Sequence, residues 1–222
     1  MIKIEKINVW GFEHAIRGMR NPLNSWDRSD SRYVASGKRY DDIDYVVGKD
    51  DLRLMRNLYG SGTEHRKFLR QIMVSMDITA PLYWWKEFDT YKIGTTANSC
   101  STMHTIHKKE FVIDDFSHEN LHGIAFEQLY KLIDVLNLNR ERYLQTRSKE
   151  YWWNLIQLLP SSYNQKRTLT FNYENVSTII RQRKDHKLDE WRQFVGVLKD
   201  LPYVREIMAK KANTDALEDD LK

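Results

Sequence analysis

A dense run of small polar side chains lies between Thr95 and Thr102, directly after the aromatic and charged stretch "YWWKEFDTYKIG". The run supplies hydroxyl and amide groups from six positions: Thr95, Thr96, Asn98, Ser99, Ser101 and Thr102. Such side chains are common in turns, and they also bind polar ligands through hydrogen bonds. Composition alone leaves both interpretations open.

Other residues near this run give little sign of metal or nucleophilic chemistry. His104 and His107 are spaced i, i+3 and could share a metal on a helix, but the sequence places no third ligand beside them, so we expect no metal site. Cys100 has no obvious partner base, and a lone cysteine is usually inert. The chain also lacks a glycine-rich phosphate loop, a G-x-S-x-G elbow and a kinase signature.

The segment "RSDSRYVASGKR" (28–39) mixes cations with serine hydroxyls, which suits anion binding, although a solvated loop is the simpler interpretation. The pairs Trp84–Trp85 and Trp152–Trp153 could stack planar rings. Packing in a core or a subunit interface is the simpler interpretation for both pairs.

The overall composition indicates a globular protein without a membrane anchor. The chain has 222 residues, 41% hydrophobic and 30% charged, with a net charge of only +4, so nucleic acid is not an expected partner. Its N-terminus lacks the apolar segment of a signal peptide, and no apolar run approaches the ~20 residues of a membrane helix. With one cysteine, no intrachain disulfide can form, and we expect a cytoplasmic protein.

In the first half of the chain, alternation predicts a strand with one buried face over residues 2–10 and another strand over 68–76. Residues 20–39 are polar and turn-rich and predict a long loop. A helix capped by Asp50 or Asp51 should end at the glycines of residues 60–62.

Beyond residue 76, helical patterns dominate. Thr79 followed by Pro81 predicts a helix start, with the helix running from Leu82 to about Lys92. Ser117 should cap a helix with an apolar stripe over 121–136. The remaining elements expected are a helix over 140–159 closed by Pro160, a strand over 168–171, helices over 174–183 and 188–199, and a frayed tail at 210–222. Together they predict one helix-rich α+β domain, residues 1–222, with a small sheet.

The order of residues in the central region resembles the flavin-dependent thymidylate synthases. That family has a His, a strand, a helix that begins A-P-(I/L)-(F/Y)-x-x-R-Q, and then R-H-R-x-x-S-x-N-E-x-S-x-R-Y. His65 stands at the place of the first His, and "APLYWWKE" (80–87) matches the helix start. "TYK" (90–92) lies where R-H-R is expected, and "NSCSTMH" (98–104) lies over N-E-x-S-x-R-Y.

The C-terminal half resembles the same family independently. The family has Leu-Pro, then T-x-N-x-R-x-L before a helix that ends in Arg. Here "LLP" (158–160) precedes "TFNYENVSTIIRQR", which supplies Thr170, Asn172 and Arg183 in that order. The similarity spans roughly residues 60 to 200, and residues 1–60 are only weakly alignable. The resemblance implies a mainly antiparallel sheet.

Several departures affect charged positions of the family pattern. The R-H-R triplet, which holds the flavin in the family, is here Thr90, Tyr91 and Lys92. The change removes charge-assisted contacts worth ~1.5–3 kcal/mol each. Met103 replaces an Arg that binds the nucleotide phosphate, and Glu174 replaces another Arg that faces the nucleotide, which predicts repulsion. Other cations of the early loop would then have to bind the phosphates: Arg28, Arg32, Lys38 or Arg39.

The resemblance implies a set of site residues. Arg183 would be catalytic, because it would polarise the uracil base and stabilise negative charge that develops on it. Four further residues would bind the substrate: Asn98, Ser99, Ser101 and Glu87. Six residues would bind the cofactor: His65, Tyr91, Lys92, Thr95, Asn172 and Thr178. The polar run would then be a ligand-binding surface, and Asn98 and Arg183 should line one pocket for a pyrimidine nucleotide.

The implied reaction is the methylation of dUMP to dTMP, with methylenetetrahydrofolate as carbon donor and NADPH-reduced FAD as hydride donor. Family members are homotetramers with active sites built across subunits. Two alternatives remain open: a diverged enzyme that modifies another pyrimidine nucleotide, and a non-catalytic nucleotide-binding protein that has lost FAD binding with the triplet.

Overall fold

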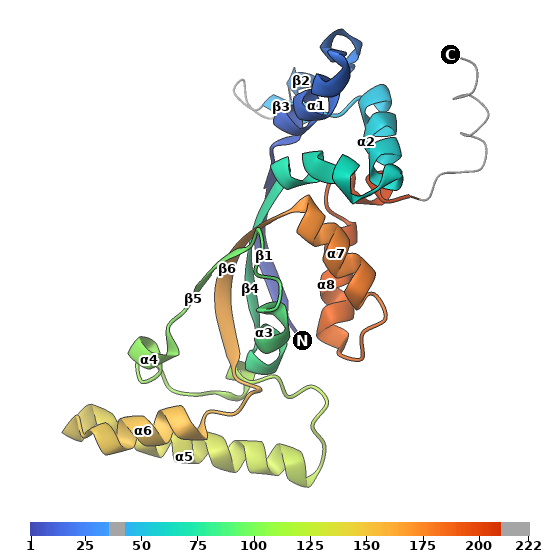
Figure 1. Cartoon of the computed structure of the whole chain (residues 1–222). Coiled ribbons are helices and arrows are strands. Elements are labelled where there is room, and N and C mark those ends of the chain that lie inside the picture. The colour runs from blue at the N-terminus through green and yellow to red at the C-terminus, as the bar shows by residue number, and fades with distance from the viewer. Residues whose placement is uncertain (36–42, 210–222) are drawn as a thin grey trace. The chain divides into compact units, whose positions relative to one another are not determined.

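The computed structural model describes residues 1–35 and 43–209 and has the predicted α+β architecture, rich in helices with a small antiparallel sheet (Figure 1). The strands are β1 (Lys3–Trp10), β2 (Arg32–Ala35), β3 (Ile43–Val46), β4 (Met73–Pro81), β5 (Thr96–Ser99) and β6 (Asn164–Asn172). The helices are α1 (Phe12–Arg20), α2 (Lys49–Ser61), α3 (Leu82–Phe88), α4 (Thr102–Thr105), α5 (Ile124–Thr146), α6 (Lys149–Leu158), α7 (Tyr173–Arg183), α8 (Asp189–Lys199) and α9 (Val204–Ile207). Short 3-10 helices span Asn21–Leu23, Trp26–Arg28, Thr63–Gln71 and Ile113–Asp115.

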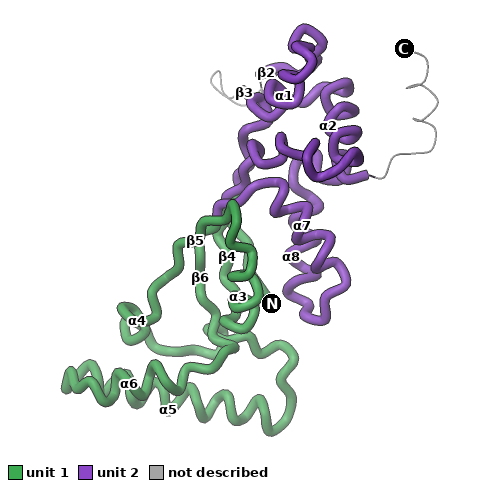
Figure 2. The backbone as a smooth tube through the Cα atoms, in the orientation of Figure 1, with its two compact units in different colours: residues 1–7, 76–169 green, residues 8–75, 170–222 purple. Residues whose placement is uncertain are grey.

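The chain divides into two compact units (Figure 2). Unit 1 comprises residues 1–7 and 76–169, and unit 2 comprises residues 8–75 and 170–222. The prediction of a single domain over residues 1–222 stays a prediction. The predicted frayed tail at 210–222 lies outside the described residues, as do positions 36–42 of the early loop.

Four strands form one sheet in the order β1-β4-β6-β5. Strand β4 shows the alternation that places it in the core, because Val74, Met76 and Ile78 are buried while the residues between them are half-buried. Strand β1 lies where the sequence predicts it, but its predicted buried face is wrong. Lys6 adopts a left-handed conformation with φ of 55° and Ile7 is 44% exposed.

In unit 1, α5 and α6 pack against each other around Leu129, Ile133, Leu136 and Leu155. The predicted helices over 121–136 and 140–159 are wrong at their boundary. α5 continues to Thr146, and the chain turns at Arg147, which adopts a left-handed φ of 56°.

Helix α3 is anchored by its aromatic side chains. Trp84, Trp85 and Phe88 are all buried, and their rings contact one another at centroid distances of 4.8–5.6 Å. The guanidinium of Arg167 lies 4.3 Å from the centre of the Trp85 ring, while its Nη1 donates to Asp89 Oδ1 at 2.7 Å. The interpretation of Trp84–Trp85 as packing residues is confirmed.

In unit 2, the cap of α2 comes from a distant residue. The Asp30 carboxylate accepts bonds from the backbone N–H groups of Asp50 and Asp51 at 3.0 and 3.1 Å. The predicted capping by Asp50 or Asp51 is therefore wrong. Asp51 is instead fully buried, and its Oδ1 accepts a 2.6 Å bond from Arg20 Nε.

Other local predictions are corrected as well. Thr79 does not cap α3, because it lies within β4, and α3 ends at Phe88 rather than near Lys92. Ser117 does not cap α5, whose N-cap position is Gly123. Between Phe68 and Gln71 the chain is a 3-10 helix, and the strand begins only at Met73.

The polar segment at 20–39 is not one loop, because it contains two 3-10 helices and β2. Strand β2 pairs with β3 in antiparallel register, with Tyr33 opposite Tyr45. Helix α1 begins after Gly11, whose φ is +97°; a Cβ there would lie 2.1 Å from the Gln71 carbonyl oxygen, so only glycine fits. The predictions included no helix in this region.

Candidate functional site

The polar run forms an edge strand and a helix cap in unit 1. β5 lies at the edge of the sheet beside β6, and the side chains of Thr96 to Ser99 are exposed. The Cys100 N–H donates to the Lys166 carbonyl at 2.9 Å. Ser101 is the N-cap of α4, and its Oγ accepts from the His104 N–H at 3.3 Å. The run therefore presents hydroxyl and amide side chains on an ordered backbone.

A pocket of about 450 Å³ adjoins the end of this run within unit 1. Its polar lining includes Cys100 and Thr102 from the run, and Asn164 and Lys166 from β6. The volume lies in the range of small-molecule sites. None of the predicted site residues lines this pocket, and the role assigned to them stays a prediction.

Asn164 and Tyr163 were missed from the sequence because nothing marks them within the polar stretch after Pro160. Asn164 Oδ1 is buried and has no hydrogen-bond partner among the described residues. Burial raises the pKa of the Tyr163 hydroxyl, and the neighbouring Asp115 and Cys100 add to this effect. The pocket thus combines an open acceptor with a hydroxyl that stays protonated.

An ion pair fixes one wall of the pocket. Lys166 Nζ lies 2.9 Å from Asp77 Oδ2, and the Thr168 hydroxyl donates to Asp77 Oδ1 at 2.7 Å. The Thr168 hydrogen bond, followed by Lys166, lowers the pKa of Asp77, and Asp77 in turn raises the pKa of Lys166.

The predicted cofactor residues of unit 1 lie between α3 and β5. Tyr91 and Lys92 follow the end of α3, and the Tyr91 N–H donates to the Phe88 carbonyl at 2.9 Å. Lys92 is exposed and Glu87 is half-buried. The Thr95 hydroxyl oxygen is buried and has no partner within residues 1–35 and 43–209.

The other predicted residues belong to unit 2. His65 lies in the 3-10 helix Thr63–Gln71 with an exposed side chain. Asn172 is the N-cap of α7, where its side chain accepts from the Asn175 N–H at 3.1 Å. Thr178 lies further along the same helix.

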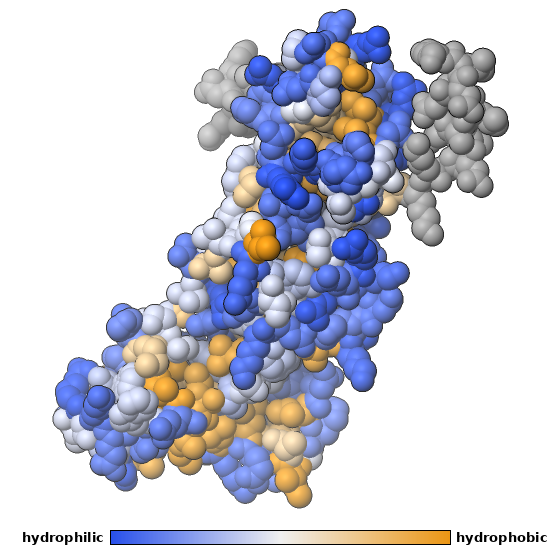
Figure 3. Space-filling model, viewed as in Figure 1, coloured by the Kyte–Doolittle hydropathy of each residue, from blue (hydrophilic) through white to orange (hydrophobic). Residues whose placement is uncertain are grey.

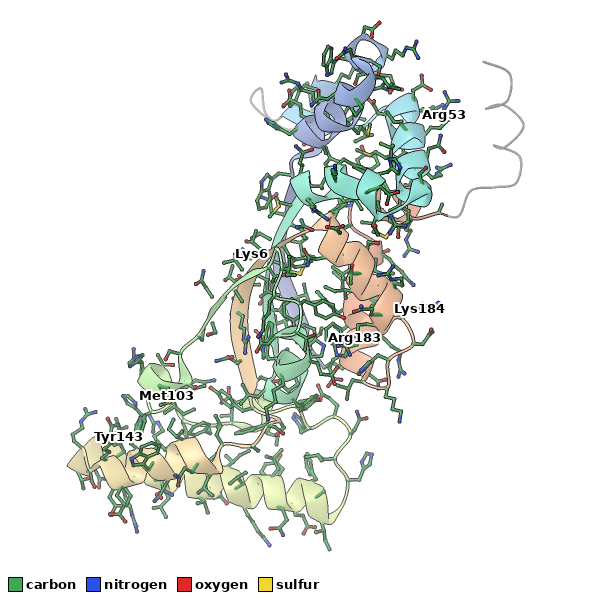
Figure 4. All side chains as sticks on the ribbon, viewed as in Figure 1. Lys6, Arg53, Met103, Tyr143, Arg183 and Lys184 are labelled. Atoms are coloured by element: carbon green, nitrogen blue, oxygen red, sulfur yellow. The ribbon has the colours of Figure 1, made fainter. Side chains whose placement is uncertain are left out.

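Arg183 lies in the last turn of α7 and is labelled in Figure 4. Its guanidinium is 4.5 Å from the centre of the Trp191 ring on α8, a cation–π contact that restricts the side chain. Asn98 belongs to unit 1 and Arg183 to unit 2, so their convergence on one pocket stays a prediction.

Glu174 has a partner that the sequence did not reveal. Its carboxylate pairs with Arg70, whose Nη2 lies 3.2 Å from Oε1 and whose Nε also donates to Oε2. The carboxylate predicted to repel a nucleotide therefore has a cationic partner within unit 2.

Over residues 1–35 and 43–209, no group of three or more His, Cys, Asp or Glu side chains is arranged to hold a metal ion. Among the helices described, none has both the length and the apolarity to cross a bilayer.

The fold is similar to that of solved flavin-dependent thymidylate synthases. A crystal structure of thymidylate synthase X (ThyX) from Helicobacter pylori with FAD and dUMP aligns with a TM-score of 0.65 at 16% identity, over 93% of this chain and 96% of that one. A second structure of this Helicobacter pylori enzyme, also complexed with FAD and dUMP, aligns with a TM-score of 0.64 at 16% identity, over 92% and 96%. No protein-family model and no curated protein matches the sequence. The resemblance is thus confirmed at the level of the fold.

Proposed function

We propose that this chain is a flavin-dependent thymidylate synthase-like enzyme that converts dUMP to dTMP. Methylenetetrahydrofolate would donate a one-carbon unit to carbon 5 of the uracil, in exchange for the proton at that carbon. When bound, FAD would carry the hydride that reduces this unit to a methyl group, and NADPH would supply that hydride to FAD.

The observation that carries the proposal is the fold. The alignment spans nearly the full length of an enzyme solved with FAD and dUMP, and this chain keeps Asn98, Ser101 and Arg183 of the family pattern. At 16% identity the fold alone is shared, so the activity needs its own test.

The proposed roles follow from the chemistry of the side chains. Arg183, held over Trp191, would donate hydrogen bonds to the uracil base and stabilise negative charge developing there. The exposed amide and hydroxyls of Asn98, Ser99 and Ser101 would hold the nucleotide, with Glu87 beside them.

One of the predicted cofactor residues, Thr95, has a buried polar atom to which FAD could form a hydrogen bond. The buried Thr95 hydroxyl has no partner in the described part of the chain, and a buried polar atom of this kind is stabilised when a ligand supplies the missing bond. Lys92 supplies a cation for the phosphates. The remaining residues proposed to hold the cofactor are His65, Tyr91, Asn172 and Thr178.

Visible absorbance tests this proposal. The protein incubated with excess FAD and then freed of unbound cofactor should be yellow, with a flavin band in the blue. Release of tritium from dUMP labelled at carbon 5, dependent on methylenetetrahydrofolate and NADPH, should follow. A colourless protein would rule out the flavin-dependent activity.

One observation favours a second candidate. Met103 on α4 is 47% exposed (Figure 4) where the family has a phosphate-binding Arg, and methionine cannot donate a hydrogen bond. The alternative is a diverged pyrimidine-nucleotide-modifying enzyme or a non-catalytic nucleotide-binding protein. FAD binding without tritium release would favour the diverged enzyme, and a thermal shift with dUMP but none with FAD would favour the binding protein.

We also propose that the protein is a cytoplasmic homo-oligomer, with a tetramer favoured. Apolar side chains gather on the surface over α5 and α6 (Figure 3). Ile124 is 75%, Leu138 48% and Trp153 42% exposed, and exposed apolar surface of this kind is typical of interfaces. Light scattering should give the mass of a tetramer, and a stable monomer would contradict this proposal.

A further inference from the structure

A second pocket, of about 210 Å³, lies in unit 2 and is lined by α1, the segment after it, and strands β2 and β3. These elements are adjacent in Figure 1. Of the residues predicted for the thymidylate synthase site, only Arg32, one of the cations expected to bind phosphate, lines it.

The floor of this pocket contains a buried cation. Arg20 is only 5% exposed, and its Nε and Nη1 donate to Asp51 Oδ1 and to the Ser25 carbonyl at 2.6 and 3.1 Å. These two bonds use two of the five N–H donors of a guanidinium. Asp51 also accepts from the Ser29 hydroxyl, at 2.6 Å, so the floor is held rigidly before any ligand arrives.

Two further guanidinium groups stand at the rim. Arg17 lies on the same face of α1 as Arg20, at i, i+3 spacing, and Arg32 begins β2; both are exposed and both line the pocket. Among the residues described, neither has an ion-pair partner. Glu13 also lines the pocket, but its carboxylate accepts a 2.6 Å bond from the Tyr33 hydroxyl.

Arg17 and Arg32 outnumber the one carboxylate that lines the pocket, Glu13, so the lining is cationic and attracts an anion such as a phosphate monoester, whose charge is about −1.5 to −2 at pH 7. Guanidinium groups also bind phosphate oxygens in pairs, with parallel hydrogen bonds.

Aromatic rings form the remaining walls. Tyr33 and Trp26 are 57% and 50% exposed, and Tyr45 contacts the Tyr33 ring at 5.0 Å between centroids. Rings beside guanidinium groups provide surfaces on which a planar base can stack.

We infer that this pocket binds a nucleoside monophosphate at a site separate from the predicted catalytic one. The phosphate binds to Arg17, Arg20 and Arg32, and the base stacks on Tyr33 or Trp26. Of the described cations of segment 28–39, Arg32 lines this pocket and Arg28 does not.

Isothermal titration of the full chain with dUMP tests the inference. The wild type should bind one or two dUMP molecules per chain, depending on whether the catalytic site also binds. In either case the variant R17Q/R32Q should bind one fewer, or should bind dUMP in this pocket at least tenfold more weakly. The matched control Arg53→Gln removes an exposed cation of α2 that does not line the pocket and should titrate like the wild type. An R17Q/R32Q titration equal to that of the wild type would overturn the inference.

The two halves of the ligand are tested separately. Deoxyuridine, which lacks the phosphate, should not bind this site, and orthophosphate should compete weakly with dUMP. The variant W26A/Y33A removes both candidate rings and should bind dUMP much more weakly than W26F/Y33F, which lacks the same Tyr33 hydroxyl but keeps the rings, while the two variants should bind orthophosphate equally. If orthophosphate binds as tightly as dUMP, the site is not a nucleotide site.

The inference does not depend on the proposed function. If FAD fails to bind, the dUMP binding that requires Arg17 and Arg32 should still be present. Conversely, if tritium release occurs but R17Q/R32Q binds dUMP like the wild type, only the inference about this pocket is lost.

Discussion

Buried polar groups have different surroundings in two regions of the molecule. In unit 2, the fully buried Asp51 accepts bonds from three side chains and a backbone N–H. In unit 1, buried polar atoms of Thr95, His107 and Asn164 have no hydrogen-bond partner in the described chain. A buried polar atom without a hydrogen-bond partner lowers the free energy of unfolding by about 1–3 kcal/mol. The comparison indicates that the Asp51 cluster stabilises the fold, whereas the unit 1 atoms lie where a ligand or partner would add bonds.

The largest change in the free energy of unfolding is expected at Asp51, whose buried carboxylate is fully hydrogen-bonded. Asp51→Asn leaves the buried Arg20 charge without its counter-ion and should lower the free energy of unfolding by about 3–5 kcal/mol, measured by urea denaturation. The neighbouring Asp50→Asn removes only an exposed pair with Arg53 and should cost at most about 0.5 kcal/mol. Equal costs for the two variants would contradict the structural role of Asp51.

The cap of α2 should give the next largest effect. Asp30→Ala should cost about 1 kcal/mol. Gly48→Ala should lose the same cap, since its Cβ would lie 2.1 Å from Asp30 Cγ, and the double variant should cost little more than either single one. Burial raises the pKa of Asp30, but bonds from the Asp50 and Asp51 N–H groups outweigh it and the pKa is lowered. The cap contribution is therefore present above the unfolded pKa of ~3.9 and lost as the pH falls through the lower folded value. Fully additive costs would show that Gly48 and Asp30 act separately.

At the buried polar atoms without hydrogen-bond partners in the described ranges of the chain, substitution should raise the free energy of unfolding instead of lowering it. Thr95→Val replaces an unpaired buried hydroxyl by a methyl group of similar shape and should raise the free energy of unfolding by about 0.5–1 kcal/mol. The same change should weaken FAD binding about tenfold, followed by flavin absorbance, if Thr95 contacts the cofactor. Thr96→Val, at an exposed position of β5, is the control. A destabilised Thr95→Val protein with unchanged FAD affinity would break the comparison.

The smallest change in the free energy of unfolding is expected from the protonation of His107. Burial, followed by the charges of Arg147, Lys108 and Arg140, lowers the pKa of His107. As the pH falls, His107 of the unfolded chain binds a proton at about pH 6.5, whereas His107 of the folded chain does so only at a lower pH. The free energy of unfolding should therefore fall as the pH decreases below about 6.5. His107→Gln should flatten this part of the pH–stability profile. An unchanged profile in His107→Gln would show that the ring does not contribute.

Elements with strong local patterns were predictable. The helices α7 and α8 and the strand β1 follow the predicted ranges closely, because periodicity and alternation depend only on neighbouring residues. Thr170 and Asn172 lie at the end of β6 as the family resemblance orders them.

Features that depend on distant residues were not predictable. The cap of α2 comes from Asp30, about twenty positions away, and Arg70 pairs with Glu174, about a hundred positions further along the chain. Sequence spacing carries no information about such pairs. The pocket residue Asn164 was missed for the same reason, since burial rather than residue type distinguishes it.

The most direct test is a crystal structure of the assembly with FAD and dUMP. We predict that the uracil lies within hydrogen-bond distance of Arg183 and that Asn98 contacts the same nucleotide, from one chain or from a neighbouring copy. A structure in which dUMP contacts neither residue, or in which Asn98 and Arg183 lie in unconnected regions of the assembly, would contradict the proposed function.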